Sequence, residues 1–199
     1  MKTYVTLLTF CLIAFTSCKK NPSTPSTLLP NPVIEMEYTN LNDKEVKYQQ
    51  SAVVIDVNKD NRADIIFETL LTGDFIHKID KLKFQVLTNI TTALPVNNNE
   101  QVPVMNPNET ITINNFNGYE WYGGSEIVLM ERQENAIGNM SWSGNWLGTQ
   151  KKYLPFQIYQ NNKRYNGWVE VSADNISQRL VIHRFAHCKQ AEVSIIAGK

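Results

Sequence analysis

The stretch that most constrains the fold runs from Ser51 to Leu70, with the sequence SAVVIDVNKDNRADIIFETL. An apolar run ends at Asp56, and a second apolar run begins at Ile65. Between the two runs lie closely spaced side chains that carry oxygen atoms. Two short apolar runs, rich in β-branched residues and joined by a polar segment, are typical of a β-hairpin. The stretch therefore predicts strand, polar loop and strand.

The remainder of the chain repeats this pattern of short strands and polar turns. Apolar and polar side chains alternate with a period of two, and turns rich in Asn and Gly separate the runs. The expected strands are 33–39, 46–56, 65–71, 82–86, 110–113, 126–131, 154–159, 165–172, 179–184 and 191–197. Because about ten short strands follow one another, with few or no helices, we predict an all-β fold, an antiparallel, jelly-roll-like β-sandwich.

The first 32 residues carry an export signal and a tether rather than part of the fold. Residues 1–17 predict a signal peptide, with Lys2 followed by a mostly apolar stretch that is too short to span a bilayer. The segment Phe15-Thr16-Ser17-Cys18 resembles the bacterial lipobox, which implies cleavage before Cys18 and lipidation of that residue. Residues 18–32 are rich in Pro, Ser and Thr and predict a tether. Residues 33–199 then form a single β domain, which we expect to be anchored to the outer membrane on its periplasmic side or at the cell surface.

Charge and cysteine content exclude several classes of protein. Without residues 1–17 the chain keeps 18 of its 19 basic residues and all 19 acidic residues, and the basic residues do not cluster. A nucleic-acid partner is therefore not expected. Of the three cysteines, Cys11 leaves with the signal peptide and Cys18 receives lipid, so that Cys188 has no partner for an intramolecular disulfide. We expect Cys188 to be a small buried residue.

The polar loop of the hairpin has the donors of a calcium site. Oxygen ligands occur at the side chains of Asp56, Asn58, Asp60 and Asp64, and the backbone carbonyl of Arg62 completes the spacing. Calcium prefers six to eight oxygen ligands, whereas zinc prefers His and Cys. The sequence therefore predicts a structural calcium ion, and the alternative is a metal-free turn rich in Asp and Asn.

Residues 56–66, DVNKDNRADII, resemble the strand-flanked calcium loops of FG-GAP and integrin-type propeller repeats. In those loops a Gly follows the third ligand, whereas this chain has Asn61, a residue that tolerates left-handed backbone better than most. A helical calcium hand would need Glu at the twelfth position, which is Phe67. The resemblance covers one hairpin and implies a calcium clip between two strands, not a propeller.

The C-terminal half resembles bacterial, Bacteroidetes-like exported lipoproteins that carry the pattern Y-G-W-[VI]-x-[VL]-S and end in A-G, and in this chain Asn166 stands between the Tyr and the Gly, which gives Y-x-G-W-V-x-V-S. The matching residues are 165–172 and, near the end of the chain, Ala197-Gly198. The resemblance implies a secreted β domain and no particular reaction.

Aromatic residues suggest a second reading of the function. Trp121, Tyr122, Trp142 and Trp146 are candidates for a glycan-binding surface, because exposed rings stack on the apolar faces of sugars. The alternative is that these rings fill the core. We accordingly expect a structural or partner-binding envelope protein, with an envelope protein or a glycan as its partner.

No motif in the sequence predicts an enzyme. His183 and His187 would lie on one face of a strand but about 13 Å apart, which is too far to chelate one ion. No nucleophile elbow is present. The members of a Ser–His–acid triad need not be near in sequence, so a hydrolase would be indicated only by a polar cleft that joins a His to a Ser or a carboxylate.

Overall fold

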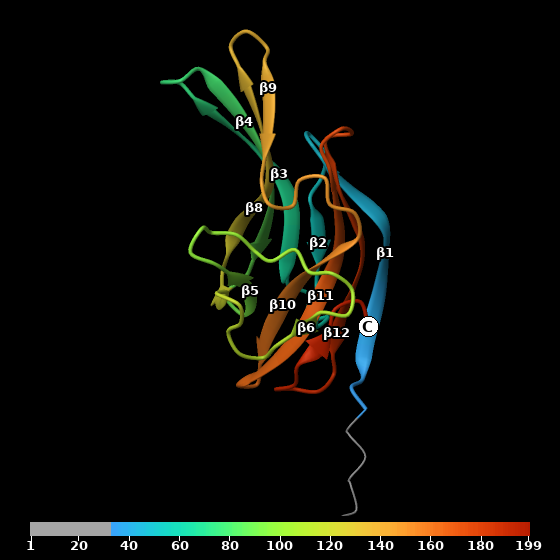
Figure 1. The fold of residues 1–199 in the computed structure, drawn as a ribbon. Helices are drawn as coiled ribbons and strands as arrows, with labels where there is room; N and C mark the ends of the chain where they lie inside the picture. The colour runs from blue at the N-terminus through green and yellow to red at the C-terminus, as the bar shows by residue number, and fades with distance from the viewer. Residues whose placement is uncertain (1–32) are drawn as a thin grey trace, which may run out of the picture. The chain divides into compact units, whose positions relative to one another are not determined.

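Two antiparallel sheets face one another in the computed structural model of the protein, which describes residues 33–199 (Figure 1). The strands are β1 (Met36–Lys47), β2 (Val53–Ile55), β3 (Ile65–Asp74), β4 (Ile79–Thr88), β5 (Thr92–Val96), β6 (Thr110–Ile111), β7 (Glu120–Gly123), β8 (Glu126–Asn135), β9 (Met140–Ser143), β10 (Lys152–Gln160), β11 (Lys163–Asp174), β12 (Arg179–Cys188) and β13 (Ile195–Ile196). Sheet A has the order β1-β12-β11-β10-β5-β7, and sheet B has the order β2-β3-β4-β8-β9. Strands β6 and β13 form a small third sheet.

This architecture confirms the predicted all-β antiparallel sandwich. Residues Val33–Lys199 form one compact unit. No helix long and apolar enough to cross a membrane occurs between residues 33 and 199. The predicted signal peptide, the lipidation site at Cys18 and the tether lie outside the described residues.

The main core lies between the two sheets. Sheet B contributes Ile65, Phe67, Leu82, Phe84, Val86 and Leu129, and sheet A contributes Leu94, Leu154, Phe156, Val169, Val171, Leu180 and Ile182, all of them buried. Along β11, Val169, Val171 and Ala173 point into this core, as the period of two requires. The alternate residues therefore point to the outer face of sheet A.

A second apolar cluster covers part of that outer face. Trp168 of β11 packs edge-on against Tyr153 of β10, with ring centroids 5.0 Å apart. Ile111 of β6 and Ile195 of β13 close over them. Cys188 is buried in the same cluster, as expected, and this burial raises the pKa of its thiol. Sheet A is thus buried on both faces over much of β10, β11 and β12.

The strand boundaries differ from the prediction in a few places. The expected strand 46–56 is split, because β1 continues to Lys47 and a turn precedes β2. Strands β5, β7 and β9 were not predicted. Strand β5 contains Pro95, which has no backbone N–H to donate. Only Thr92 and Ala93 of β5 pair with β10, so Pro95 lies beyond that ladder.

Sheet B is longer than sheet A at one end. Strands β3 and β4 stay paired as far as Asp74 and Ile79, and β8 continues the ladder from β4 to Asn135. Residues 70–83 and 131–143 therefore form a projection, which we call the arm and which extends beyond the sandwich at the top of Figure 1.

Candidate functional site

The loop between β2 and β3 wraps around the carboxylate of Asp56. Asp56 Oδ1 accepts a hydrogen bond from the Asp60 N–H at 3.1 Å, and Oδ2 accepts one from the Asn61 N–H at 2.8 Å. Asp60 Oδ1 in turn accepts the Arg62 N–H at 2.9 Å. Asn61 has a φ of 67°, which confirms that Asn supplies the left-handed turn where Gly was expected. The loop is therefore closed by its own side chains.

Asp64 has a different role from the other acidic residues of the loop. Its side chain is buried, and its Oδ2 accepts the Val57 N–H at 2.8 Å. Its Oδ1 accepts hydrogen bonds from Asn89 Nδ2 at 3.0 Å and from Thr92 Oγ1 at 3.3 Å. Asp64 thus fastens the hairpin to the connection between β4 and β5.

The predicted calcium ligands are brought together only in part. Asp56, Asn58 and Asp60 are linked by hydrogen bonds, including one from Asn58 Nδ2 to Asp60 Oδ2 at 3.3 Å. Asp64 instead faces three protein donors. Within residues 33–199, no three His, Cys, Asp or Glu side chains are grouped closely enough to hold a metal ion. Calcium binding by this loop therefore stays a prediction.

The structure does not bring the four aromatic candidates together on one surface. Trp146 is fully buried in the main core, and its backbone N–H, in the turn after β9, donates to the Leu129 carbonyl at 3.2 Å. Trp142 lies on β9 of sheet B and packs against Phe84 at 6.1 Å between ring centroids. Trp121 and Tyr122 lie on β7 of sheet A, and only Tyr122 is mostly exposed.

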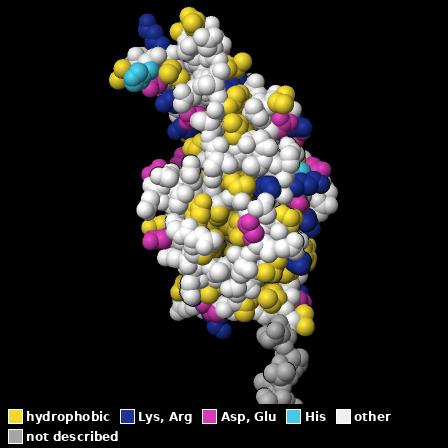
Figure 2. Space-filling model, in the orientation of Figure 1, with side chains coloured by type: hydrophobic (Ala, Val, Ile, Leu, Met, Phe, Trp, Pro, Cys, Tyr) yellow, Lys and Arg dark blue, Asp and Glu magenta, His cyan; other side chains and the backbone are white. Residues whose placement is uncertain are grey.

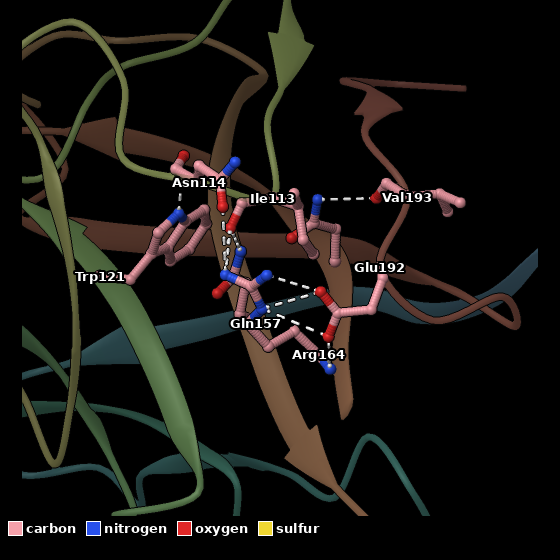
Figure 3. Close-up of polar contacts among 8 residues, drawn as sticks. Ile113, Asn114, Trp121, Gln157, Arg164, Glu192 and Val193 are labelled. Atoms are coloured by element: carbon pink, nitrogen blue, oxygen red, sulfur yellow. Dashed lines mark hydrogen bonds and ion pairs between the residues drawn. The ribbon is translucent and has the colours of Figure 1, made fainter. Parts of the chain in front are cut away.

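Trp121 lines a depression of about 360 Å³ together with Gln157, Tyr159 and Arg164. Figure 3 shows the hydrogen bonds that hold the side chains lining this depression in place. Trp121 Nε1 donates to the Asn114 carbonyl at 3.3 Å, and Gln157 Nε2 donates to the Ile113 carbonyl at 2.8 Å (Figure 3).

Arg164 ties the wall of the depression to the C-terminal segment. Its Nη2 lies 2.6 Å from Glu192 Oε2, and its Nη1 donates to the Ile113 carbonyl at 3.1 Å (Figure 3). This ion pair lowers the pKa of the Glu192 carboxyl. The polar groups around the depression are thus mostly paired with one another.

The two turns at the end of the arm carry strongly exposed apolar side chains. At the β3–β4 turn, Phe75 is 93% exposed and Ile76 is 88% exposed, and at the β8–β9 turn Ile137 is 82% exposed. Leu70, Leu71 and Met140 are also exposed along the arm. Figure 2 shows hydrophobic side chains at the end of the arm beside charged ones. We did not predict this site from the sequence, although an apolar pair directly after Gly73-Asp74 is unusual for a solvated turn.

A hollow of about 680 Å³ lies between the two turns of the arm. Its lining includes three acidic side chains, Asp74, Asp80 and Glu134, and one lysine, Lys78. His77 donates two hydrogen bonds to the Asp74 carboxylate, one from its backbone N–H and one from its ring Nδ1. The backbone bond and then the side-chain bond lower the pKa of the Asp74 carboxyl. Lys81 Nζ lies 3.8 Å from Asp74 Oδ2 and Arg132 Nη2 lies 3.3 Å from Glu134 Oε2, so two of the three carboxylates are paired with basic side chains of the arm.

Comparisons of the chain with models of protein families, with characterised proteins and with solved structures found no match.

Proposed function

We propose that this protein is a lipid-anchored protein of the cell envelope and that its arm binds a partner protein there. The segment 15–18 supports the anchor through its resemblance to a lipobox. One observation carries the binding proposal: Phe75, Ile76 and Ile137, on two adjacent turns, are each more than 80% exposed. Several strongly exposed apolar side chains gathered on one part of a domain are typical of protein–protein contact sites.

The chemistry of the arm indicates the kind of partner. The hollow between the turns contains three carboxylates and one lysine. The arm as a whole carries four acidic and four basic residues, so it has no excess positive charge that would attract an anionic lipid surface. A protein segment with apolar side chains would complement the exposed Phe75, Ile76 and Ile137. The partner surface is therefore apolar at its centre, with polar groups at its edge.

Photo-crosslinking tests this proposal in intact cells. With benzoylphenylalanine at position 75 or 137 of the full chain, we expect one discrete protein adduct. The same probe at position 163, an exposed lysine at the start of β11 and at the opposite end of that strand from the arm, should give none. Adding Ile76→Ser to the probe at 137 should lower the adduct yield at least tenfold. Adducts are detected by immunoblot and identified by mass spectrometry.

Other outcomes of the crosslinking would contradict the proposal. Adducts to lipid alone would show that the arm meets a membrane, and adducts to a second copy of the chain would show self-association. The Ile76→Ser substitution should shift the melting temperature by no more than about 2 °C, because substitutions at exposed positions usually change the free energy of unfolding by about 0.5 kcal/mol or less.

Calcium would contribute to this function by stabilising the β2–β3 hairpin. The loop supports the proposal with an all-oxygen donor set from Asp56, Asn58, Asp60 and the carbonyl of Arg62. Because hydrogen bonds already close the loop, an ion would add to a turn that is formed without it. The contribution of the ion is therefore small.

Thermal melting measures this contribution. For a site with the affinity of extracellular modules, about 2 mM calcium adds about 1 kcal/mol to the free energy of unfolding. The melting temperature should therefore rise by about 2–4 °C over that in EGTA. Asp60→Asn, which keeps the acceptor but removes a charge, should abolish the response, and magnesium should not replace calcium. Equal melting temperatures in EGTA and calcium would refute the calcium site.

A further inference from the structure

Three side chains on the outer face of sheet A form a chain of hydrogen bonds. Ser172 Oγ of β11 lies 2.8 Å from His183 Nε2 of β12. His183 Nδ1 lies 2.6 Å from Asp43 Oδ1 of β1. Serine, histidine and aspartate in this order and at these distances are the arrangement that activates a serine nucleophile.

His183 stands at an interruption of both neighbouring ladders. The pairing of β1 with β12 jumps from Asn40–Arg184 to Lys44–Ile182, so that His183 has no single partner on β1. The pairing of β11 with β12 is also irregular between Glu170 and Val171. Bulges of this kind re-aim side chains and are over-represented beside active sites. They turn His183 and Asp43 toward each other across the sheet.

The backbone of β1 is irregular at the same place. Asn42 has a φ of 56° and Asp43 has a φ of 55°, in the left-handed region that Asn and Asp tolerate better than most residues. One of these two residues carries the carboxylate that contacts His183.

The hydrogen bonds assign the protons. The Lys151 N–H donates to Ser172 Oγ at 2.9 Å, so the serine hydroxyl is left to donate to His183 Nε2. The Asp43 carboxylate can only accept, so the proton of the neutral imidazole lies on Nδ1. The lone pair of Nε2 therefore faces the hydroxyl, as a general base requires.

The three residues line a common depression of about 330 Å³. Its other walls are mostly polar, with Glu45, Gln150 and Arg179 among them. Ser172 is only 4% exposed, and the depression has no apolar channel for a long acyl chain among its lining residues. A short acyl group is the substrate that fits, and the limited access to Ser172 predicts slow turnover.

We propose that Ser172, His183 and Asp43 form a catalytic triad that hydrolyses short-chain acyl esters. Ser172 Oγ attacks the carbonyl carbon of the ester while its proton passes to His183 Nε2. The ester C–O bond then breaks, the alcohol leaves with the proton from Nε2, and an acyl-serine remains. Water attacks this acyl group, gives its proton to Nε2, and the acid is released as Ser172 regains its proton.

Each residue has a separate role in these steps. Ser172 is the nucleophile and His183 is the acid–base group. Asp43 is a positioning residue, which keeps the Nδ1 proton in place and stabilises the imidazolium. The Lys151 N–H donates to Oγ and so orients the hydroxyl toward His183.

Two probes test the proposal on the full chain. A fluorophosphonate reporter should label the wild-type protein, and mass spectrometry should place the adduct on Ser172. With 4-nitrophenyl acetate, Ser172→Ala should show no hydrolysis above the buffer rate, and His183→Gln should lose at least about a hundredfold in kcat/KM. Asp43→Asn should lower kcat about tenfold with KM unchanged, and Asp43→Glu should recover part of that loss. Ser51→Ala, an exposed serine in the β1–β2 turn, should behave as the wild type.

A purely structural cluster would give a different result. In that case the wild-type protein would not be labelled at Ser172 and would not hydrolyse the ester, while Ser172→Ala and His183→Gln would still lower the melting temperature. Labelling at another serine would also overturn the proposal. Because the site of labelling is read in the wild-type protein, this result does not depend on how well the variants fold.

Discussion

Replacing Asp64 with alanine is expected to lower the free energy of unfolding by about 4 kcal/mol. The substitution leaves the Val57 N–H, the Asn89 amide and the Thr92 hydroxyl without their common acceptor. Each buried donor that loses its partner costs about 1–3 kcal/mol, and local rearrangement recovers some of this cost. Urea denaturation at pH 7, followed by tryptophan fluorescence, measures the change.

Two further variants separate this effect from a simple loss of charge. Asp64→Asn should lower the free energy of unfolding by less than Asp64→Ala does, about 2 kcal/mol. The amide oxygen of Asn can still accept a hydrogen bond, whereas its NH₂ group would face a protein donor that it cannot pair with. Asp80→Ala removes a carboxylate from an exposed position of the arm and should change the free energy by no more than about 0.5 kcal/mol. Similar losses for Asp64→Ala and Asp80→Ala would show that the buried network contributes little.

Gly167→Ala is expected to destabilise the fold by about 3 kcal/mol. A Cβ at Gly167 would lie 2.2 Å from Phe156 Cζ and 2.7 Å from the Ala186 carbonyl oxygen. Phe156 is fully buried in the main core and directly opposite Gly167 in the β10–β11 ladder, so its ring has little room to move. The change is read as a shift of the urea midpoint at constant slope.

Gly73→Ala is the matched control, because Gly73 also lies in a strand but has no neighbour within 3.4 Å of the added Cβ. It should be neutral within about 0.5 kcal/mol. Because Phe156→Leu removes the ring that the added methyl group meets, the double variant should cost less than the sum of the two single variants. If Gly167→Ala were as mild as Gly73→Ala, the close approach of the two strands would not be a constraint.

The fold could largely be predicted because strand patterning is a local property. The period of two identified β4, β8, β10, β11 and β12, whose inward residues fill the core. It failed for β5, where Pro95 is tolerated only because the β10 ladder stops before it, and for the short strands β7 and β9. Strands β5 and β7 are held by pairing with strands distant in sequence, which leaves no mark in a short window of sequence. Strand β9 pairs with β8 over only four residues.

The candidate sites could be predicted less well than the fold. The spacing of Asp56, Asn58 and Asp60 indicated a compact loop, and the hydrogen bonds among these residues show that the loop is compact. They do not test whether the loop binds an ion. Nothing in the spacing showed that Asp64 would turn toward Asn89, which is 25 residues away.

The Ser–His–Asp contact was beyond sequence reasoning for the same reason. Asp43 and His183 are separated by 140 residues and meet because β1 pairs with β12 at the edge of sheet A. The expectation that the chain is no enzyme rested on the absence of a local motif, and a triad assembled across three strands has none.

The position of β1 has a mechanical consequence. Strand β1 begins at the end of the domain that lies away from the arm and runs alongside β12 toward the arm (Figure 1). Under the function proposed above, tension between a lipid anchor and a partner bound to the arm would act along β1. Such a load shears the hydrogen bonds between β1 and β12 together instead of peeling them apart one after another. This geometry suits a domain that must stay folded while it is pulled.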